Sequence, residues 1–245
     1  LVIKIRGLGD AVLATPVLKN LKALLPNVSI SVLTFNFCKP LFENNPNIDA
    51  LYGLSEKPEA LELKKMTADL SANNFDLIIN LHARNLSSKL TQNIKARWRI
   101  NRSYFIREKF SDVMIGSDHE FDKSSIERDL DCIRSIGLKP IKKQPELYIT
   151  DKESEWANEY LIESGLDREK KIIMIHPAVT QPYRHWGMDR FVELSKKLIQ
   201  GGENQVMGIF SKMEQPIAKN LLEKVEGVFV YVGALRQSMA LIQQA

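Results

Sequence analysis

The order of the first elements constrains the fold more than any other feature of this sequence. Leu1–Ile5 reads as a short apolar strand, a glycine-containing turn follows, and then comes a helix that Pro26 ends. Apolar residues recur in that helix at helical spacing: Val12, Leu13, Val17, Leu18, Leu21 and Leu25. Further strands are predicted at Val28–Leu33 and Asp76–Leu81. Strands that alternate with helices form a parallel sheet, so the sequence predicts the α/β class.

The same alternation starts again in the second half of the chain. A stretch with lysine and proline, Pro140–Pro145, precedes a predicted helix at Glu153–Glu163. Strands are then expected at Lys171–Ile175, Gln205–Phe210 and Val228–Val232, and helices at Met188–Ile199, Glu214–Val225 and Arg236–Gln244. We therefore predict two doubly wound lobes, residues 1–150 and 151–245, which face each other across a ligand cleft at the carboxyl ends of their sheets. The second lobe has only three strands, so we expect it to be incomplete and the chain to be truncated at its carboxyl end.

Composition excludes several classes of protein. The chain has 245 residues, of which 44% are hydrophobic and 26% charged, as in ordinary globular proteins. No apolar run reaches the roughly 18 residues that span a bilayer, and the first residues lack a signal-peptide pattern, so a cytoplasmic location is expected. Cys38 and Cys132 are predicted to be buried apolar side chains. The four histidines and two cysteines form no metal signature, and we expect no metal.

The positive charge is concentrated in the first lobe. Residues 1–150 contain 22 Lys and Arg against 17 Asp and Glu, a net charge of +5, whereas residues 151–245 carry −1. Residues 95–109 (KARWRINRSYFIREK) form the densest basic segment. It indicates an anionic partner, or else an ordinary solvated loop and helix face. No aromatic RNA-binding motif accompanies the segment, so a nucleic-acid partner is not expected.

The turn at Ile5–Pro16 (IRGLGDAVLATP) resembles a dinucleotide-binding loop but fails its pattern. The third glycine position is Val12, and Leu33-Thr34-Phe35 provides no acid for a ribose. A dehydrogenase or an epimerase is therefore disfavoured. Asp10 has two interpretations: a helix N-cap, typically worth about 1 kcal/mol, or a cleft carboxylate that accepts a proton from substrate.

Four segments together resemble one known family. They are IKIRGLGDAVLATPVLKNLKALLPN, NNPNIDALY, FDLIINLHARNLSSKL and HPAVTQPYRHWGMDRFVELSKKL, and they follow one another in the family's order. The family is glycosyltransferase family 9, the bacterial heptosyltransferases of lipopolysaccharide core assembly. The resemblance implies a GT-B fold of two Rossmann-like lobes, with acceptor bound by residues 1–150 and a nucleotide sugar by residues 151–245. It also implies inverting transfer without a metal or a separate cofactor.

The resemblance also assigns residues to the donor side and to catalysis. Asp10 stands where the family has its catalytic base. Thr180 and Arg184 match the phosphate-contacting loop, where Arg184 replaces a common lysine. Glu214 matches an acid that faces the donor, although a first-turn glutamate is also favoured by the helix dipole alone. His176 and Trp186 are expected to be structural. The family's Asp-Ser-Gly motif is missing.

The implied substrates are ADP-heptose and an anionic, Kdo-bearing lipid A precursor at the cytoplasmic face of the inner membrane, where peripheral contact is expected. Candidate acceptor contacts are Arg84, Arg97, Arg99 and Arg102. The sequence thus predicts an inverting transferase that moves a heptose, or a related sugar, to a lipopolysaccharide core. Two alternatives stay open: a family 9 transferase for another sugar or glycan, and a non-catalytic protein that binds anions or nucleic acid.

Overall fold

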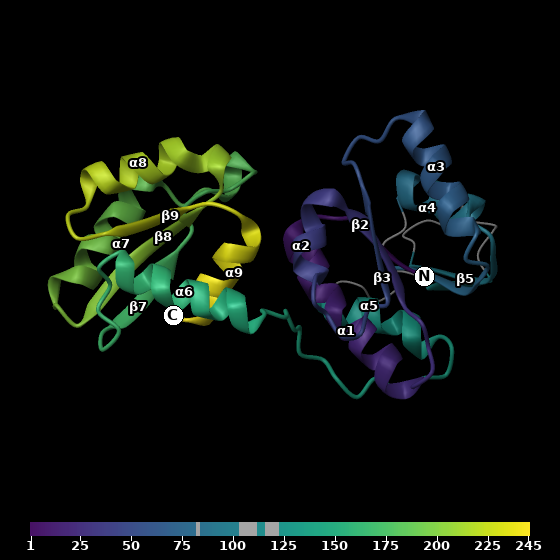
Figure 1. Ribbon diagram of the computed structural model, residues 1–245. Coiled ribbons are helices and arrows are strands. Elements are labelled where there is room, and N and C mark those ends of the chain that lie inside the picture. Colours follow the sequence, from purple (N-terminus) through teal and green to yellow (C-terminus); the bar gives the residue numbers. More distant parts are fainter. Residues whose placement is uncertain (82–83, 103–111, 116–122) are drawn as a thin grey trace. The chain divides into compact units, whose positions relative to one another are not determined.

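A computed structural model describes residues 1–81, 84–102, 112–115 and 123–245. The chain divides into two compact units, Leu1–Tyr148 and Ile149–Ala245. Figure 1 shows the strands of each unit gathered into a sheet with helices on both faces. Each unit is described by itself below.

The first unit is built on a six-stranded parallel sheet. Its strands lie in the order β3-β2-β1-β4-β5-β6. In chain order they are β1 (Val2–Lys4), β2 (Ser31–Phe35), β3 (Ala50–Leu54), β4 (Phe75–Asn80), β5 (Ala96–Arg102) and β6 (Val113–Ile115). Ile3 of β1 pairs with Leu33 of β2 on one side and with Asn80 of β4 on the other. Because all the strands are parallel, their carboxyl ends share one edge of the sheet.

Helices cover both faces of this sheet. They are α1 (Leu8–Leu24), α2 (Lys39–Phe42), α3 (Ala60–Ser71), α4 (Asn85–Asn93) and α5 (Ser125–Arg134), with a 3-10 turn at Asn36–Cys38. Helix α1 packs against α5. On the opposite face, Leu70 of α3 and Leu90 of α4 pack on Ile3 and Ile78. Lys4, next to Ile3 in β1, therefore points toward the α5 face.

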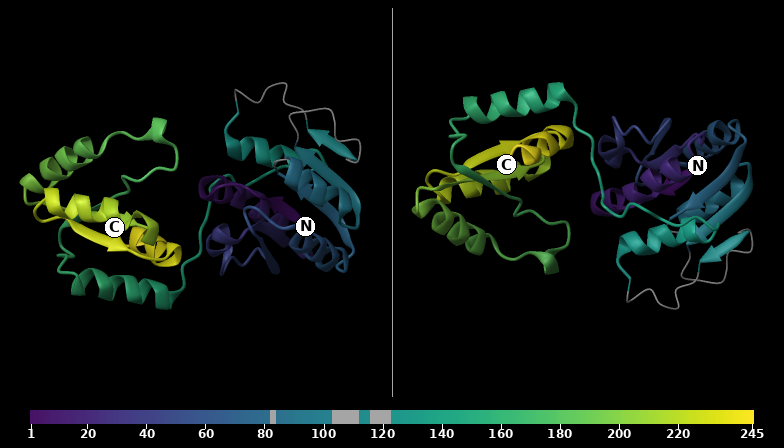
Figure 2. Two further views of the ribbon diagram at one scale, coloured as in Figure 1. Left: turned by 90° about the horizontal axis from the view of Figure 1, so that it is seen from above. Right: turned by 90° about the horizontal axis from the view of Figure 1, so that it is seen from below.

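The second unit has a three-stranded parallel sheet in the order β7-β8-β9. Its strands are β7 (Lys171–Ile175), β8 (Asn204–Phe210) and β9 (Phe229–Val232), and its helices are α6 (Asp151–Glu163), α7 (Met188–Gln200), α8 (Gln215–Lys224) and α9 (Leu235–Gln243). Met207 and Ile209 pack under α6 and α9, whereas Val206 and Phe210 pack under α7 and α8. The two views of Figure 2 show this helix, sheet and helix layering.

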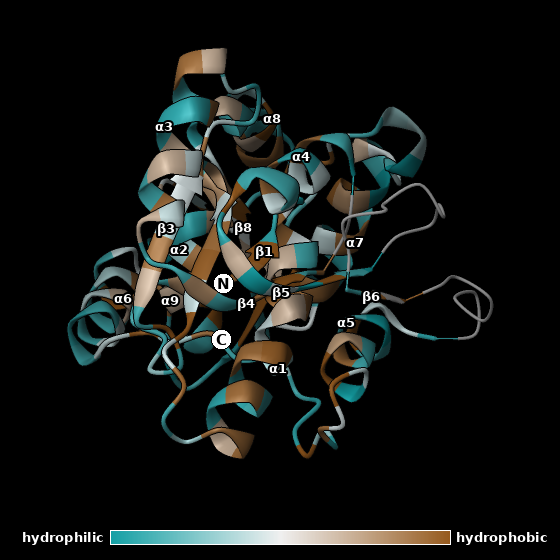
Figure 3. Ribbon diagram, turned by 90° about the vertical axis from the view of Figure 1, so that its right-hand side faces the viewer, coloured by the Kyte–Doolittle hydropathy of each residue, from teal (hydrophilic) through white to brown (hydrophobic). Residues whose placement is uncertain are grey.

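The residue pattern explains these elements. Strands covered on both faces are expected to be apolar on both, and Figure 3 shows hydrophobic colour on β1 and β8. Helix α6 starts with a capping box in which the Thr150 and Glu153 side chains each bond the other's backbone N–H. Ser124 caps α5 by accepting from the Glu127 N–H. Among the described residues, no helix is both long and apolar enough to cross a bilayer.

The predicted α/β class with parallel sheets is confirmed, and strand β7 coincides with its predicted bounds. Strand β2 begins at Ser31 rather than Val28, because Ile30 N–H donates to the Asp49 carboxylate instead of joining the ladder. For residues 95–109, the alternative is a solvated loop and helix face. This alternative is wrong for residues 96–102, because they form strand β5. Residues 103–109 lie outside the described part of the chain.

Candidate active site

The β1–α1 turn places Asp10 at the carboxyl edge of the first sheet. The N-cap of α1 is Gly7, with extended backbone, so Asp10 is the third residue of the helix and the N-cap interpretation is wrong. The Asp10 carboxylate pairs with the Arg6 guanidinium, Nε to Oδ2 3.4 Å, and its side chain is 36% exposed. Cys38 Sγ donates to the Arg6 carbonyl oxygen at 3.3 Å, which links the backbone of this turn to the 3-10 turn that contains Cys38. Asp10 is thus accessible and restrained.

A buried charge cluster, Lys4, Asp129 and Arg102, underlies this edge. Lys4 Nζ lies 2.5 Å from Asp129 Oδ2, and Arg102 Nε lies 3.6 Å from Asp129 Oδ1. The exposed fractions are 2% for Lys4, 0% for Asp129 and 5% for Arg102. Burial raises the pKa of the Asp129 carboxyl, and the two cations oppose that shift.

The predicted acceptor arginines occupy different places. Arg84 is the N-cap of α4 and exposed, in the connection that leaves the carboxyl end of β4. Arg102 ends β5 at the same edge, but it is buried and donates from Nε to the Leu81 carbonyl at 2.6 Å. Burial makes direct contact between Arg102 and a large acceptor unfavourable.

Arg97 is the second residue of β5 and Arg99 its central residue, so both lie before that edge. At about 3.3 Å per residue, Arg97 is roughly 16 Å before Arg102 along the strand. Arg99 donates to the carbonyl oxygens of Thr91, Ile94 and Ala96, where α4 ends and β5 begins. The structure therefore does not bring Arg97 or Arg99 together with Asp10.

The predicted donor residues follow two neighbouring strands of the second unit. Thr180 and Arg184 are exposed in the connection between β7 and α7, where Pro182–Arg184 forms a 3-10 turn. The Arg184 guanidinium lies 5.5 Å from the centre of the Tyr183 ring. Gly187, the N-cap of α7, has a φ of 106°, a conformation that favours glycine. The connection thus presents a hydroxyl and a guanidinium before a helix N-terminus, which suits phosphate.

Glu214 follows β8 at the same edge. Its Oε2 accepts from the Ser211 N–H at 2.7 Å within a capping box, while Oε1 lies 3.8 Å from His176 Nε2. His176 Nδ1 lies 2.6 Å from the Ile209 carbonyl oxygen, so the backbone contact expected for His176 is present. Trp186 packs edge-on against Phe191 of α7, with ring centres 5.1 Å apart. Thr180, Arg184 and Glu214 therefore share one sheet edge.

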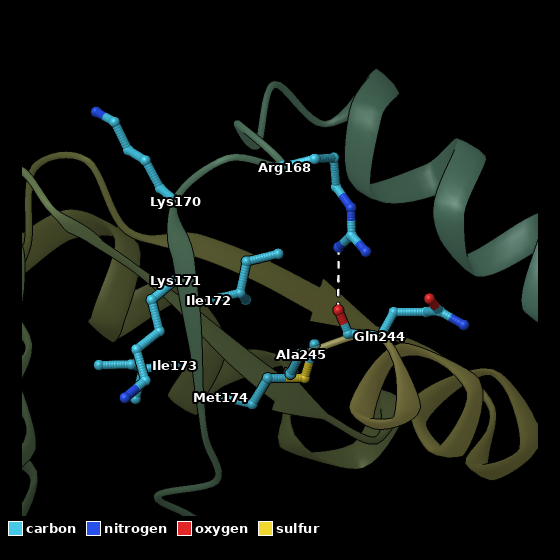
Figure 4. Close-up of a pocket in the computed structure, with 8 residues that line it drawn as sticks. All are labelled: Arg168, Lys170, Lys171, Ile172, Ile173, Met174, Gln244 and Ala245. Carbon is cyan, nitrogen blue, oxygen red and sulfur yellow. Dashed lines mark hydrogen bonds between the residues drawn. The ribbon is translucent and has the colours of Figure 1, made fainter.

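Two surface pockets of the described residues lie away from these predicted site residues. Figure 4 shows one of about 510 Å³ beside β7, where Arg168 Nη1 bonds the Gln244 carbonyl oxygen at 3.0 Å. The other, about 540 Å³, lies between α3 and α4. Neither includes a residue predicted for the site. In the part of the chain that the structure describes, no group of three metal-binding side chains occurs.

Sequence reasoning missed Lys4 and Asp129. The available signal was a lysine inside the apolar run LVIKI, which a two-sided buried strand does not accommodate without a partner. The partner lies 125 residues away, on a helix that the sequence analysis did not predict.

Comparison with known proteins identifies relatives. A family model described as glycosyltransferase family 9 (heptosyltransferase) matches residues 63–245. The lipopolysaccharide heptosyltransferase 3 of Escherichia coli strain K12 is 27% identical over 208 residues, which cover 81% of this chain and 59% of that protein. This chain therefore spans about three fifths of that relative's length.

Solved structures agree in fold. The family 9 glycosyltransferase of Veillonella parvula DSM 2008 matches 100% of this chain and 73% of its own, with a TM-score of 0.90 and 21% identity. The ADP-heptose lipopolysaccharide heptosyltransferase II of E. coli matches 100% and 76%, with a TM-score of 0.80 and 20% identity. At these identities the likeness establishes the fold alone, and the predicted GT-B class is confirmed.

Proposed function

This chain belongs to glycosyltransferase family 9, and we propose that it takes part in moving a heptose, or a related sugar, from an ADP-linked donor to a lipopolysaccharide-core acceptor. The single observation that carries the proposal is Asp10: an accessible carboxylate at the carboxyl edge of a parallel sheet, held by Arg6. This edge is where open α/β sheets bind ligands.

Asp10 acts as the general base. It takes the proton from an acceptor hydroxyl as that oxygen attacks the anomeric carbon, and the bond from that carbon to the ADP phosphate oxygen breaks. One displacement inverts the configuration, so no second carboxylate nucleophile is needed. Proton removal by a positioned base contributes on the order of 100- to 10,000-fold to the rate.

The second unit, Ile149–Ala245, binds the donor. The Arg184 guanidinium and the Thr180 hydroxyl contact the diphosphate and stabilise its charge as it leaves, and these groups need no metal for that role. Glu214 contacts the ribose or the sugar through its Oε1. The E. coli relative whose printed name includes ADP-heptose supports this choice of donor.

The first unit, Leu1–Tyr148, binds the anionic acceptor. Arg84 is the arginine that the structure supports for this contact, because it is exposed at the same sheet edge as Asp10. The net charge of +5 over these residues favours a cytoplasmic enzyme that touches the inner membrane peripherally, since basic residues near an anionic surface gain roughly 1 kcal/mol each.

The test compares the full-length wild type with Asp10→Asn, using ADP-heptose and a Kdo-lipid A acceptor. ADP release and a heptose mass gain on the acceptor are expected for the wild type, with turnover at least 100-fold lower in the variant and ADP affinity unchanged. Asp69→Asn, an exposed change on α3, is the matched control. Full turnover by Asp10→Asn would remove Asp10 from the mechanism. Transfer from a different nucleotide sugar only would favour the alternative of a family 9 enzyme for another sugar or glycan.

A further inference from the structure

Asp129 joins two strand ends that lead to the proposed site. It lies on α5, is fully buried, and contacts Lys4 through one carboxylate oxygen and Arg102 through the other. Lys4 is the last residue of β1 and Arg102 the last residue of β5. One carboxylate therefore ties together positions that the chain separates by almost 100 residues.

The Lys4 contact leads to the proposed base. After Lys4 the chain enters the turn that carries Arg6 and then Asp10. The Lys4 carbonyl also accepts from Thr34 Oγ1 at 2.9 Å, so the end of β1 is fixed through its backbone and its side chain. A displacement of Lys4 would move the start of this turn.

The Arg102 contact leads to the proposed acceptor side. Arg102 Nε donates to the Leu81 carbonyl at 2.6 Å, and Leu81 is the residue directly after β4. The chain that leaves Leu81 reaches Arg84, the N-cap of α4. Asp129 is thus the buried ion-pair partner, at 3.6 Å, of the guanidinium that donates to the Leu81 carbonyl, three residues before Arg84.

Such a cluster is a poor device for stability alone. Taking three charged groups out of water is unfavourable, and well-packed apolar side chains at such positions are often as stable or more so. A buried charge cluster does favour one geometry, because a charge out of water is strongly disfavoured when its opposite charge moves away. The cluster of Lys4, Asp129 and Arg102 lies at the sheet edge that carries Asp10 and Arg84. A fixed geometry there would fix the positions of these two residues.

We propose that Asp129 is a positioning residue that sets the placement of Asp10 through Lys4 and of Leu81, three residues before Arg84, through Arg102. The proposal rests on the proposed function for the roles of Asp10 and Arg84. It assigns no contact between Asp129 and substrate. It predicts that loss of the Asp129 charge disturbs catalysis and acceptor binding together, while donor binding by the second unit is unaffected.

The experiment replaces Asp129 by Asn in the full-length protein and measures three quantities: kcat and acceptor KM with ADP-heptose and Kdo-lipid A, the Kd of ADP, and amide hydrogen exchange in peptides that carry Asp10 and Arg84. Asp131→Asn is the control, on the same helix and in partly exposed ion pairs with Lys123 and Arg134. We expect Asp129→Asn to lower kcat at least 10-fold, raise acceptor KM at least 3-fold, leave the ADP Kd within 2-fold and speed exchange in both peptides. The control should change none of these.

Arg102→Lys tests the contact through Arg102 separately from the contact through Lys4. It keeps the positive charge but loses the Nε donor to the Leu81 carbonyl. We expect faster exchange only in the Arg84 peptide, and a higher acceptor KM with kcat nearly unchanged. The same variant decides the proposal if Asp129→Asn does not fold.

Unchanged exchange in both peptides overturns the proposal, as does a loss of ADP affinity equal to the loss of turnover. A wild type that transfers no sugar would contradict the proposed function, and the exchange result would still decide the role of Asp129.

Discussion

Glu214 and His176 face each other across 3.8 Å at the carboxyl edge of the second sheet. They come from the ends of neighbouring strands, and each is already held by the backbone: His176 by the Ile209 carbonyl and Glu214 by the Ser211 N–H. The Glu214 carboxylate therefore has a structural contact through one oxygen, and its other oxygen faces His176, the residue directly after β7. The sequence left open whether Glu214 faces the donor or is favoured by the helix dipole alone, and the structure adds a capping-box contact that leaves one carboxylate oxygen for a donor.

The two roles of Glu214 can be separated by substitution. Glu214→Gln keeps an oxygen that can accept from the Ser211 N–H, so stability should change by less than about 0.5 kcal/mol. If Glu214 binds the donor ribose, this variant should weaken ADP binding at least 5-fold, measured by calorimetry. Glu214→Ala should in addition cost about 0.5–1 kcal/mol of stability through the lost cap. Unchanged ADP affinity in Glu214→Gln would leave Glu214 as a cap only.

The placement of the arginines predicts different effects on the acceptor. Arg84→Ala should raise the acceptor KM about 10-fold or more, because a hydrogen bond to a charged group is worth about 1.5–3 kcal/mol. Arg97→Ala, at the far end of β5, should leave the acceptor KM within 2-fold. Both variants should bind ADP like the wild type. Equal losses in the two variants would show that the acceptor extends along β5.

The second unit should lose stability in acid through Glu153. The Arg236 guanidinium, whose Nε lies 2.7 Å from Glu153 Oε1, lowers the pKa of this carboxyl from 4.5 to about 2. A carboxyl whose pKa is lower in the folded state stabilises the fold above its unfolded pKa, and this contribution is lost as the pH falls through the folded pKa. The stability of the unit should therefore decline between about pH 4.5 and pH 2. With solvent screening we expect about 1–2 kcal/mol from this pair.

Urea unfolding of wild type and Glu153→Gln at pH 7 and at pH 2.5 measures this contribution. The variant should be less stable at pH 7, and the difference should shrink at pH 2.5. Glu159→Gln, an exposed change on the same helix, is the control. A difference that does not depend on pH would assign the effect to the capping box instead of the ion pair.

Both cysteines should be unreactive in the folded protein. Burial raises the pKa of the Cys38 thiol to about 11, and burial likewise raises the pKa of the fully buried Cys132 thiol. A rise from 9.0 to about 11 lowers the thiolate fraction near neutral pH roughly 100-fold. A chromogenic disulfide reagent at pH 7.5 should therefore titrate two thiols only after denaturant is added. Rapid reaction of one thiol in the native protein would contradict the burial of Cys38 or of Cys132.

The sequence determined most of what depends on neighbouring residues. The alternation of strands and helices predicted both units, and the bounds of β7 and the end of α6 at Glu163 follow from local periodicity and capping. The motif around Asp10 marked the turn that carries it, and the order of the four segments indicated the family. The edge strand β3 was not predicted, because four of its five residues are only partly buried. Strand β5 was not predicted, because arginines interrupt its apolar pattern.

Only the tertiary structure decided which distant residues meet. It placed Asp10 inside α1 instead of at its cap, separated Arg97 and Arg99 from the Asp10 edge, and buried Arg102 beside Asp129. The partnership of Lys4 with Asp129 joins residues 125 positions apart, on a strand and a helix that meet through sheet order and helix packing. Local periodicity states which face of an element is buried, but not which residue of another element it meets there. That pairing is fixed when the layers pack, and here it determines the charges that surround the proposed base.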